Sequence, residues 1–265
     1  MWSSRDRVIR PLSTIALLMA AGSIAAAHDV RLPRHVPLPR PRPAALAPAA
    51  AAQVPPEPSP CQINLMTTGR ALFTALPPLS GPGECGAPDV VRLEAVIMPD
   101  RTHVALAPAP TLRCSMAGAI ADWVREEIGP AAAELGARLK SIENYDSYDC
   151  RGQNRVAGAK LSEHGKANAL DIRSLDLADG KVVRLTDVGV ARSFRERIRQ
   201  SACARFKTVL GPGSDGYHEE HIHVDLAERH SDYRICHWEI REPVQAADVP
   251  LPRPRPLAAA SGRRL

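Results

Sequence analysis

The chain has few long apolar runs, and none reaches the roughly 20 residues that a membrane-spanning helix needs. The most apolar stretch, residues 12–21, follows three arginines and precedes the small residues 25–27. This order is typical of an export signal, with an uncleaved N-terminal anchor as the alternative. We therefore predict a signal peptide over residues 1–27, no transmembrane segment in the mature chain, and a periplasmic or secreted protein.

A CxxC pair is also missing, although the chain contains six cysteines. Their number is even and their spacings are wide, which in an exported chain favours disulfides over a cysteine-ligated metal. Six cysteines allow 15 pairings, and spacing does not choose among them. The cysteines are Cys61, Cys85, Cys114, Cys150, Cys203 and Cys236.

A basic central region is absent, although the whole chain carries a formal charge of +5. The predicted signal contributes +2, residues 28–59 contribute +2 and residues 243–265 contribute +3, which leaves −2 for residues 60–242. The basic residues therefore lie in the flanks, and the central region has no nucleic-acid footprint.

Proline, alanine and arginine alternate in the two flanks and mark the domain boundaries. Proline restricts the backbone and removes hydrogen-bond donors, so residues 28–59 are expected to form an extended linker and residues 243–265 a flexible tail. Residues 60–242 contain no internal repeat and are long enough for one domain with its own core.

The spacing of apolar residues within this domain predicts an α+β fold. Helical periodicity covers residues 115–140, with Pro130 breaking or restarting the helix, and residues 189–204 suit another helix. Residues 89–97 fit either a strand or a short helix, and Asp179-Gly180 predicts a hairpin turn. Strands are expected at 141–150, 168–174, 182–185, 206–210 and 221–226. We expect a small, mostly antiparallel sheet flanked by helices.

Histidines and carboxylates gather at residues 162–171 and 218–225, and five of the nine histidines lie between 164 and 230. Imidazole and carboxylate are the ligands of catalytic zinc, which takes three of them and leaves a fourth position for water. Small residues between Gly165 and Ala169 allow a tight loop, so that His164 and Asp171 can converge.

If the second cluster, residues 218–225, includes a strand, its side chains alternate between the two faces of the sheet. His221, His223 and Asp225 would then share one face, opposite Ile222 and Val224. A metal above that face would bind one of the two histidines and leave the other beside it.

The pattern Ser162-x-His164-x₆-Asp171, followed by His221-x-His223, resembles a superfamily of zinc peptidases. It includes D-Ala-D-Ala carboxypeptidases, VanX-type dipeptidases and the penicillin-insensitive murein endopeptidase. Residues 161–172 and 147–151 are more narrowly similar to the bacterial extensin-like C-terminal domain, a name that reflects proline-rich flanks. The resemblance covers most of residues 60–242.

This resemblance implies a zinc ion held by His164, Asp171 and His223 on the sheet. His218 and His221 correspond to the two histidines that assist in the murein endopeptidase. Ala167 departs from the superfamily, which usually has glycine there, and the difference concerns the shape of the loop.

The general base has two candidates. Glu220 stands where VanX-type enzymes place their glutamate, three residues before the ligand histidine. In a regular strand, however, Glu220 faces away from His223, which favours His221 as the base. His218 is assigned to stabilising the oxyanion.

Three further residues are candidates for substrate binding. Arg151 and Arg155 suit a bidentate contact to a substrate carboxylate, or are surface charges. Ser162 lies two residues before a ligand, so a role in shaping the loop competes with substrate contact or nucleophilic attack.

Together these features predict an exported zinc-dependent peptidase that hydrolyses amide bonds in peptidoglycan stem peptides or cross-links. Its partners would be peptidoglycan or muropeptides. The alternative is a non-catalytic, zinc-containing module that binds the cell envelope. The sequence does not choose between endopeptidase and carboxypeptidase action, nor does it give the oligomeric state.

Overall fold

The structure is a computed structural model that describes residues 57–243. The expected signal peptide (1–27), most of the expected linker (28–59) and nearly all of the expected tail (243–265) lie outside these residues.

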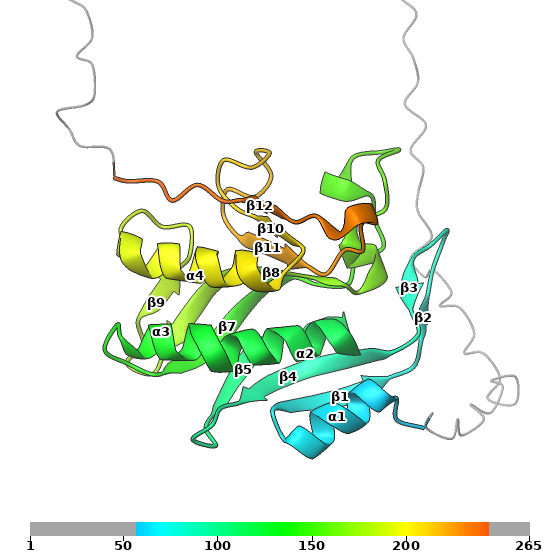
Figure 1. Cartoon of the computed structure of the whole chain (residues 1–265), viewed down its shortest axis with the longest axis horizontal. Helices are drawn as coiled ribbons and strands as arrows, with labels where there is room; N and C mark the ends of the chain where they lie inside the picture. Colours follow the sequence, from blue (N-terminus) through cyan, green and yellow to red (C-terminus); the bar gives the residue numbers. More distant parts are fainter. Residues whose placement is uncertain (1–56, 244–265) are drawn as a thin grey trace, which may run out of the picture. The chain divides into compact units, whose positions relative to one another are not determined.

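Six consecutive strands follow the first helix, and helices and strands are mixed in the rest of the described chain (Figure 1). The helical segments are α1 (Pro60–Thr68), α2 (Cys114–Trp123), the π-helical turn η2 (Val124–Ile128), α3 (Gly129–Ala133), the short 3₁₀ turns η3 (Gln153–Arg155), η4 (Glu163–Lys166) and η5 (His230–Asp232), and α4 (Arg192–Arg205). The strands are β1 (Ala71–Leu76), β2 (Leu79–Ser80), β3 (Gly86–Ala87), β4 (Val90–Ile97), β5 (His103–Ala107), β6 (Thr111–Arg113), β7 (Leu139–Asp146), β8 (Ala169–Leu177), β9 (Val182–Arg184), β10 (Thr208–Leu210), β11 (Ile222–Asp225) and β12 (Ile235–His237).

One large sheet organises the domain. It has ten strands, in the order β1-β4-β5-β7-β8-β11-β10-β12, with β6 beside β4 and β9 beside β8. All pairs are antiparallel except β5–β7 and β10–β12. The α+β class and the mostly antiparallel sheet are therefore confirmed, and the sheet is larger than expected because β1, β5, β6 and β12 extend it.

The longer helices cover one face of this sheet, and the hydrophobic core fills the space between the two layers (Figure 1). Alternation along the strands sends Leu170 and Ile172 of β8, with Val224 of β11, into this core. Across the helical layer, the ring of Trp123 packs edge-on against Phe206 at 5.2 Å between centroids. The opposite face of β8 and β11 is left for polar side chains.

The expected helix over residues 115–140 forms, but it ends earlier. A new helical segment, α3, begins at Gly129 directly after the π-helical turn, and Pro130 lies in its first turn, where a proline is tolerated. Gly136 then takes a positive φ of 101°. Leu139, expected in the helix, is buried in strand β7 instead.

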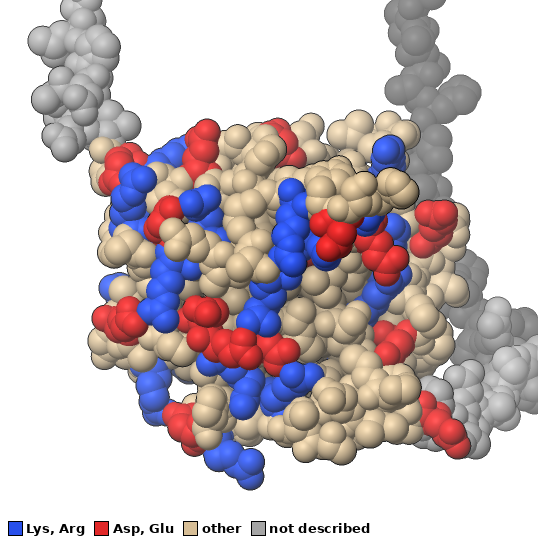
Figure 2. All heavy atoms as spheres, viewed as in Figure 1, with Lys and Arg blue, Asp and Glu red and all other residues tan. Residues whose placement is uncertain are grey.

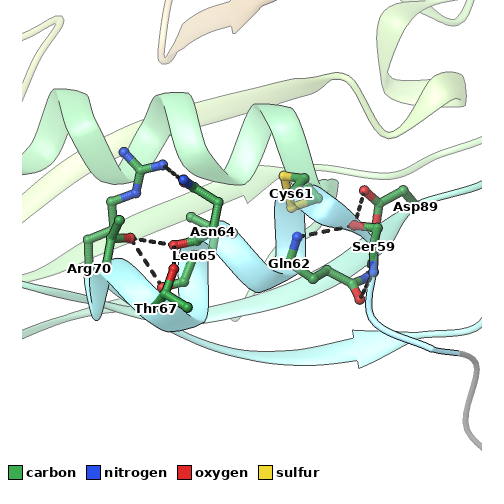
Figure 3. The surroundings of a disulfide bond; sticks show 10 residues. Ser59, Cys61, Gln62, Asn64, Leu65, Thr67, Arg70 and Asp89 are labelled. Atoms are coloured by element: carbon green, nitrogen blue, oxygen red, sulfur yellow. Dashed lines mark hydrogen bonds between the residues drawn. A yellow bond between two sulfur atoms is a disulfide. The ribbon is translucent and has the colours of Figure 1, made fainter.

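The N-terminus of helix α1 is joined to the rest of the domain by hydrogen bonds (Figure 3). Ser59 and Gln62 form a reciprocal capping box, and Pro60 occupies the first turn. The side chains of both capping residues also donate to the Asp89 carboxylate, at 2.7 and 2.8 Å. The run 89–97, which fitted a strand or a helix, is strand β4.

The expectation of disulfides is confirmed, and the structure decides the pairing. Cys61 joins Cys114, Cys85 joins Cys150, and Cys203 joins Cys236. The first bridge ties α1 to the start of α2, and the third ties α4 to β12. The second links the loop between β2 and β3 to the segment that follows β7.

The helical face of the domain carries basic and acidic side chains interspersed (Figure 2). Several are paired across helices, such as Arg197 of α4 with Glu134 at 2.5 Å and Arg205 with Glu126. Within residues 57–243, no helix combines the length and the apolar character that a bilayer span requires.

Candidate metal centre

Strand pairing places two of the expected ligands face to face. β8 and β11 are antiparallel, and their register sets Asp171 directly opposite His223. Their neighbours Ile172 and Ile222 also pair and point into the core. Directly opposed residues share a face and bring their side chains together. The alternation of apolar and polar residues in both strands therefore creates a carboxylate–imidazole pair on the open face.

The third expected ligand, His164, approaches from the turn η4. Ser162 caps this turn by accepting the backbone N–H of His164, and Ala167 closes it in the left-handed conformation at φ 52°. Glycine adopts this left-handed conformation most easily, which explains why the superfamily that the sequence resembles usually has glycine at the position of Ala167. His164 Nδ1–H donates to the carbonyl oxygen of Ser147. A carbonyl only accepts, so Nδ1 carries a proton and Nε2 is the ring nitrogen that faces the site and can bind a metal once it has no proton.

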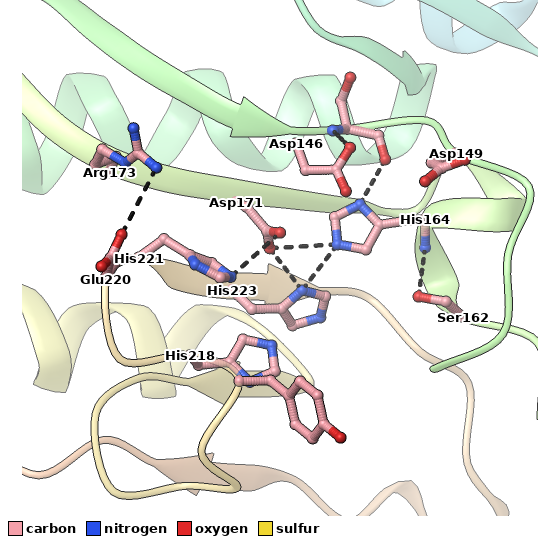
Figure 4. Close-up of polar contacts among 12 residues, drawn as sticks. Asp146, Asp149, Ser162, His164, Asp171, Arg173, His218, Glu220, His221 and His223 are labelled. Atoms are coloured by element: carbon pink, nitrogen blue, oxygen red, sulfur yellow. Dashed lines mark hydrogen bonds and ion pairs between the residues drawn. The ribbon is translucent and has the colours of Figure 1, made fainter. Parts of the chain in front are cut away.

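Three donor atoms meet in a triangle (Figure 4). Asp171 Oδ1 lies 2.9 Å from His223 Nδ1 and 3.3 Å from His164 Nε2, and the two nitrogens are 3.1 Å apart. Bonds of about 2.0–2.1 Å in a tetrahedron set zinc ligands about 3.3 Å from each other. Two imidazoles and one carboxylate at these separations fit zinc in both chemistry and spacing.

The triangle stabilises a positive charge. All three residues are buried, and their donor atoms face one another closely enough to share a proton or to surround a metal ion. On the far side of its ring, His223 Nε2 lies 3.1 Å from Asp225 Oδ2, a carboxylate behind a ligand histidine as in many metal sites.

The surroundings shift the pKa values of both His223 and Asp171. Burial alone would lower the pKa of His223, but hydrogen bonds and charge from Asp171 and Asp225 outweigh it and raise the pKa to about 10. Burial alone would raise the pKa of Asp171, yet hydrogen bonds from His164 and His223 lower it. In both cases the site favours a cation, be it a proton or a metal ion.

Two more histidines stand beside the triangle (Figure 4). His221 Nε2 is 3.4 Å from Asp171 Oδ2, and burial lowers the pKa of His221. The rings of His218 and His221 have centroids 5.1 Å apart, and His218 lies 5.6 Å from His223. His218 Nδ1 is fixed by Asp215 Oδ1 at 2.7 Å. The structure therefore brings together all four histidines that the sequence singled out in this region.

Glu220 is not part of this group. Its side chain is 80% exposed and lies 3.9 Å from Arg173, pointing away from the triangle as Figure 4 shows. Its carboxylate is thus turned to the outside of the site, but strand alternation is not the reason, because β11 begins at Ile222 and both Glu220 and His221 precede it.

The three expected substrate-binding residues line the cleft above the triangle, but they already have partners. Arg151 pairs with Asp146 at 2.8 Å and with Asp149 at 3.1 Å. Arg155, which is more exposed, pairs with the same two carboxylates at 3.3 and 2.7 Å. Ser162 is buried and serves the cap of His164, which corresponds to the loop-shaping role.

Sequence reasoning missed three supports of the site. The Ser147 carbonyl gave no signal, because a backbone atom is not encoded by residue type. Asp215 lies in a loop, and its contact to His218 depends on how that loop folds. Asp225 was placed on the same strand face as His223, and this position was the signal for its role behind the ligand.

A second cluster has donor atoms within metal-binding distance, at Cys61, Asp89 and Cys114. Its two sulfur atoms are joined in a disulfide and offer no thiolate (Figure 3). The Asp89 carboxylate instead accepts hydrogen bonds from the start of α1. This cluster is a structural joint.

Comparison with known proteins agrees with the narrower resemblance drawn from the motifs. No curated protein and no solved structure gave a significant match to the chain. The family model described as "Extensin-like protein C-terminus" matches residues 59–237, which is well over half of the chain and includes the whole donor triangle. The chain belongs to the extensin-like protein C-terminus family.

Proposed function

We propose that this domain is a zinc-dependent peptidase that hydrolyses amide bonds in peptidoglycan stem peptides or cross-links, in the periplasm or outside the cell. The observation that carries the proposal is the buried triangle of His164 Nε2, Asp171 Oδ1 and His223 Nδ1 at the floor of an open cleft. Zinc held by these atoms would polarise a scissile carbonyl and lower the pKa of water toward neutrality.

The remaining residues have positions that suit the other tasks of hydrolysis. His221 borders both the cleft and Asp171, so its imidazole can take a proton from the attacking water and deliver it to the leaving amine. When His218 carries two protons, Nδ1–H is donated to Asp215 and Nε2–H remains free for an oxyanion. The exposed Glu220 has neither position, which favours His221 as the base.

The test combines metal content with turnover. The exported protein, purified from the periplasm, should hold about one zinc per chain by elemental analysis, which also distinguishes zinc from Fe(II), another ion bound by two histidines and a carboxylate. It should cleave a cross-linked muropeptide dimer or a D-Ala-D-Ala-terminated pentapeptide. A chelator should abolish cleavage, and added zinc should restore it.

Variants separate the ligand from the base. His223→Ala should lose zinc and activity together, whereas His221→Ala should keep zinc and slow turnover by about 10²–10⁴-fold. Glu220→Gln serves as the matched control and should retain substantial activity. A zinc-loaded but inactive Glu220→Gln beside an active His221→Ala would reverse the assignment of the base. If the zinc-loaded protein cleaves neither substrate, the envelope-binding module becomes the better description.

A further inference from the structure

The cleft above the donor triangle is large and rimmed with exposed aromatic rings. It encloses about 1220 Å³, more than the roughly 300–1,000 Å³ of a typical small-molecule pocket. Among residues 57–243, the exposed large hydrophobic side chains include three aromatic ones, Tyr145, Tyr217 and Tyr233. All three line this cleft. Exposed aromatic surface gathered in one place marks a binding surface.

Tyr145 stands on one side of the triangle. It lies on β7 next to Asn144, which is buried and pairs with Ile172 of β8, so Tyr145 points to the opposite, open face. Its ring centroid is 4.7 Å from that of His221, and the guanidinium of Arg173 lies 4.0 Å from it. These contacts hold the ring in place while 46% of the residue stays exposed.

Tyr233 stands on the other side. Its ring lies 5.3 Å from the guanidinium of Arg229, which donates to the Thr208 hydroxyl and to the Lys207 carbonyl. Thr208 is on β10, directly opposite Asp225 of β11. The anchor of Tyr233 is therefore on β10, across the sheet from Tyr145.

The sheet order gives the separation, across the strands, of β7, which carries Tyr145, and β10, which carries the anchor of Tyr233. From β7 to β10 the sheet runs through β8 and β11, which carry Asp171 and His223. Three spacings of about 4.8 Å make about 14 Å, with the triangle in the middle. An extended peptide covers that distance with about four residues.

The two arginines predicted to bind a substrate carboxylate agree with a chain that continues in both directions, although Lys160 and Arg229 also line the cleft and form no ion pair with a carboxylate among the described residues. An enzyme that removes a terminal residue needs a cation for the free carboxylate. The arginines suited to that task, Arg151 and Arg155, are each paired with both Asp146 and Asp149. Their charge is thus compensated within the protein.

We propose that the cleft takes a peptide chain that extends past the metal centre on both sides, with Tyr145 and Tyr233 as contact residues on opposite sides, so that an internal bond is placed at the site. This inference rests on the proposed function and narrows it from peptidases in general to cleavage within a chain or cross-link.

Three substrates test it, with the exported, zinc-loaded protein. A cross-linked muropeptide dimer continues on both sides of the cleaved bond, a D-Ala-D-Ala-terminated pentapeptide continues on one, and D-Ala-D-Ala itself on neither. We expect kcat/KM to fall in that order, by at least about 100-fold from dimer to dipeptide. Tyr233→Ala should shrink this dimer-to-dipeptide ratio by about tenfold. Val182→Ala, an exposed residue of β9 outside the cleft, should leave the ratio unchanged.

A pentapeptide cleaved as well as the dimer, or a ratio that Tyr233→Ala does not change, would overturn the inference. If the protein cleaves none of the three, equilibrium binding of the same ligands decides. A dimer bound at least tenfold more tightly than either smaller ligand, with the difference lost in Tyr233→Ala, would support the two-sided cleft although the proposed function had failed. Equal binding of all three would refute both.

Discussion

The disulfide between Cys85 and Cys150 should influence metal binding, whereas the one between Cys61 and Cys114 should not. Cys150 lies three residues from Ser147, whose carbonyl oxygen orients His164. The same segment is joined to the turn of His164 by backbone hydrogen bonds, from Asp149 N–H to the His164 carbonyl and from Ser162 N–H to the Arg151 carbonyl. Removing the bridge frees this support.

The two disulfides form a matched pair because they close loops of similar length. Their cysteines are 65 and 53 residues apart, so the chain-entropy relation gives each about 4 kcal/mol of stabilisation. Loss of either should lower the free energy of unfolding by a similar amount. Only loss of Cys85–Cys150 loosens a partner of His164, a predicted ligand, and loss of such a partner typically weakens metal binding by about 10–100-fold.

The assay compares two double variants, Cys85→Ala/Cys150→Ala and Cys61→Ala/Cys114→Ala. Urea unfolding of the metal-free proteins measures stability, and competition with a chromophoric chelator measures zinc affinity without denaturant. We expect similar losses of stability and a selective loss of zinc affinity in the first variant. Equal zinc affinities in the two variants would refute the reasoning. Zinc affinity would then depend only on overall stability, or on neither disulfide.

Three further predictions concern the centre and its turn. Asp225→Asn should weaken zinc binding by about 10–100-fold in chelator competition, while circular dichroism shows an unchanged fold. An unchanged zinc affinity would contradict the role of Asp225 in holding the His223 ring. The pKa of metal-free His223 is raised to about 10, so below that pH zinc must displace a proton to bind. The zinc affinity, measured by chelator competition, should therefore rise about tenfold per pH unit between pH 7 and 9. A zinc affinity that does not change with pH would show that no proton is released. The free energy of unfolding of Ala167→Gly, measured in urea, should stay within about 1 kcal/mol of the wild type, because relief of the left-handed backbone offsets the lost methyl contact. Ala167→Val, which is β-branched, should lose more than about 2 kcal/mol. Equal stabilities of the two variants would contradict backbone strain at Ala167.

Much of the fold followed from local patterns. Asp179-Gly180 produced the expected hairpin between β8 and β9, where Gly180 takes a φ of 89°. The apolar spacing after residue 115 produced the long helical segment. Its end was misplaced because the apolar Leu139 fits a helix and a buried strand equally well, and strand pairing decided.

For the metal centre, residue types and spacing by themselves indicated His164, Asp171 and the histidines of the second cluster, since the chemistry of metal ligation is a property of side chains. Spacing along β11 also set His223 and Asp225 on one face. The family was determined at this level too, as the match over residues 59–237 confirms. Zinc and peptidase activity remain predictions.

Tertiary structure alone decided which distant groups meet. The register of β8 against β11 set Asp171 opposite His223, and the fold chose one pairing among the 15 that six cysteines allow. It also brought the Ser147 carbonyl to His164 and Asp215 to His218. The physical reason is that periodicity reports each residue's own environment, whereas contacts between segments depend on how the whole core packs.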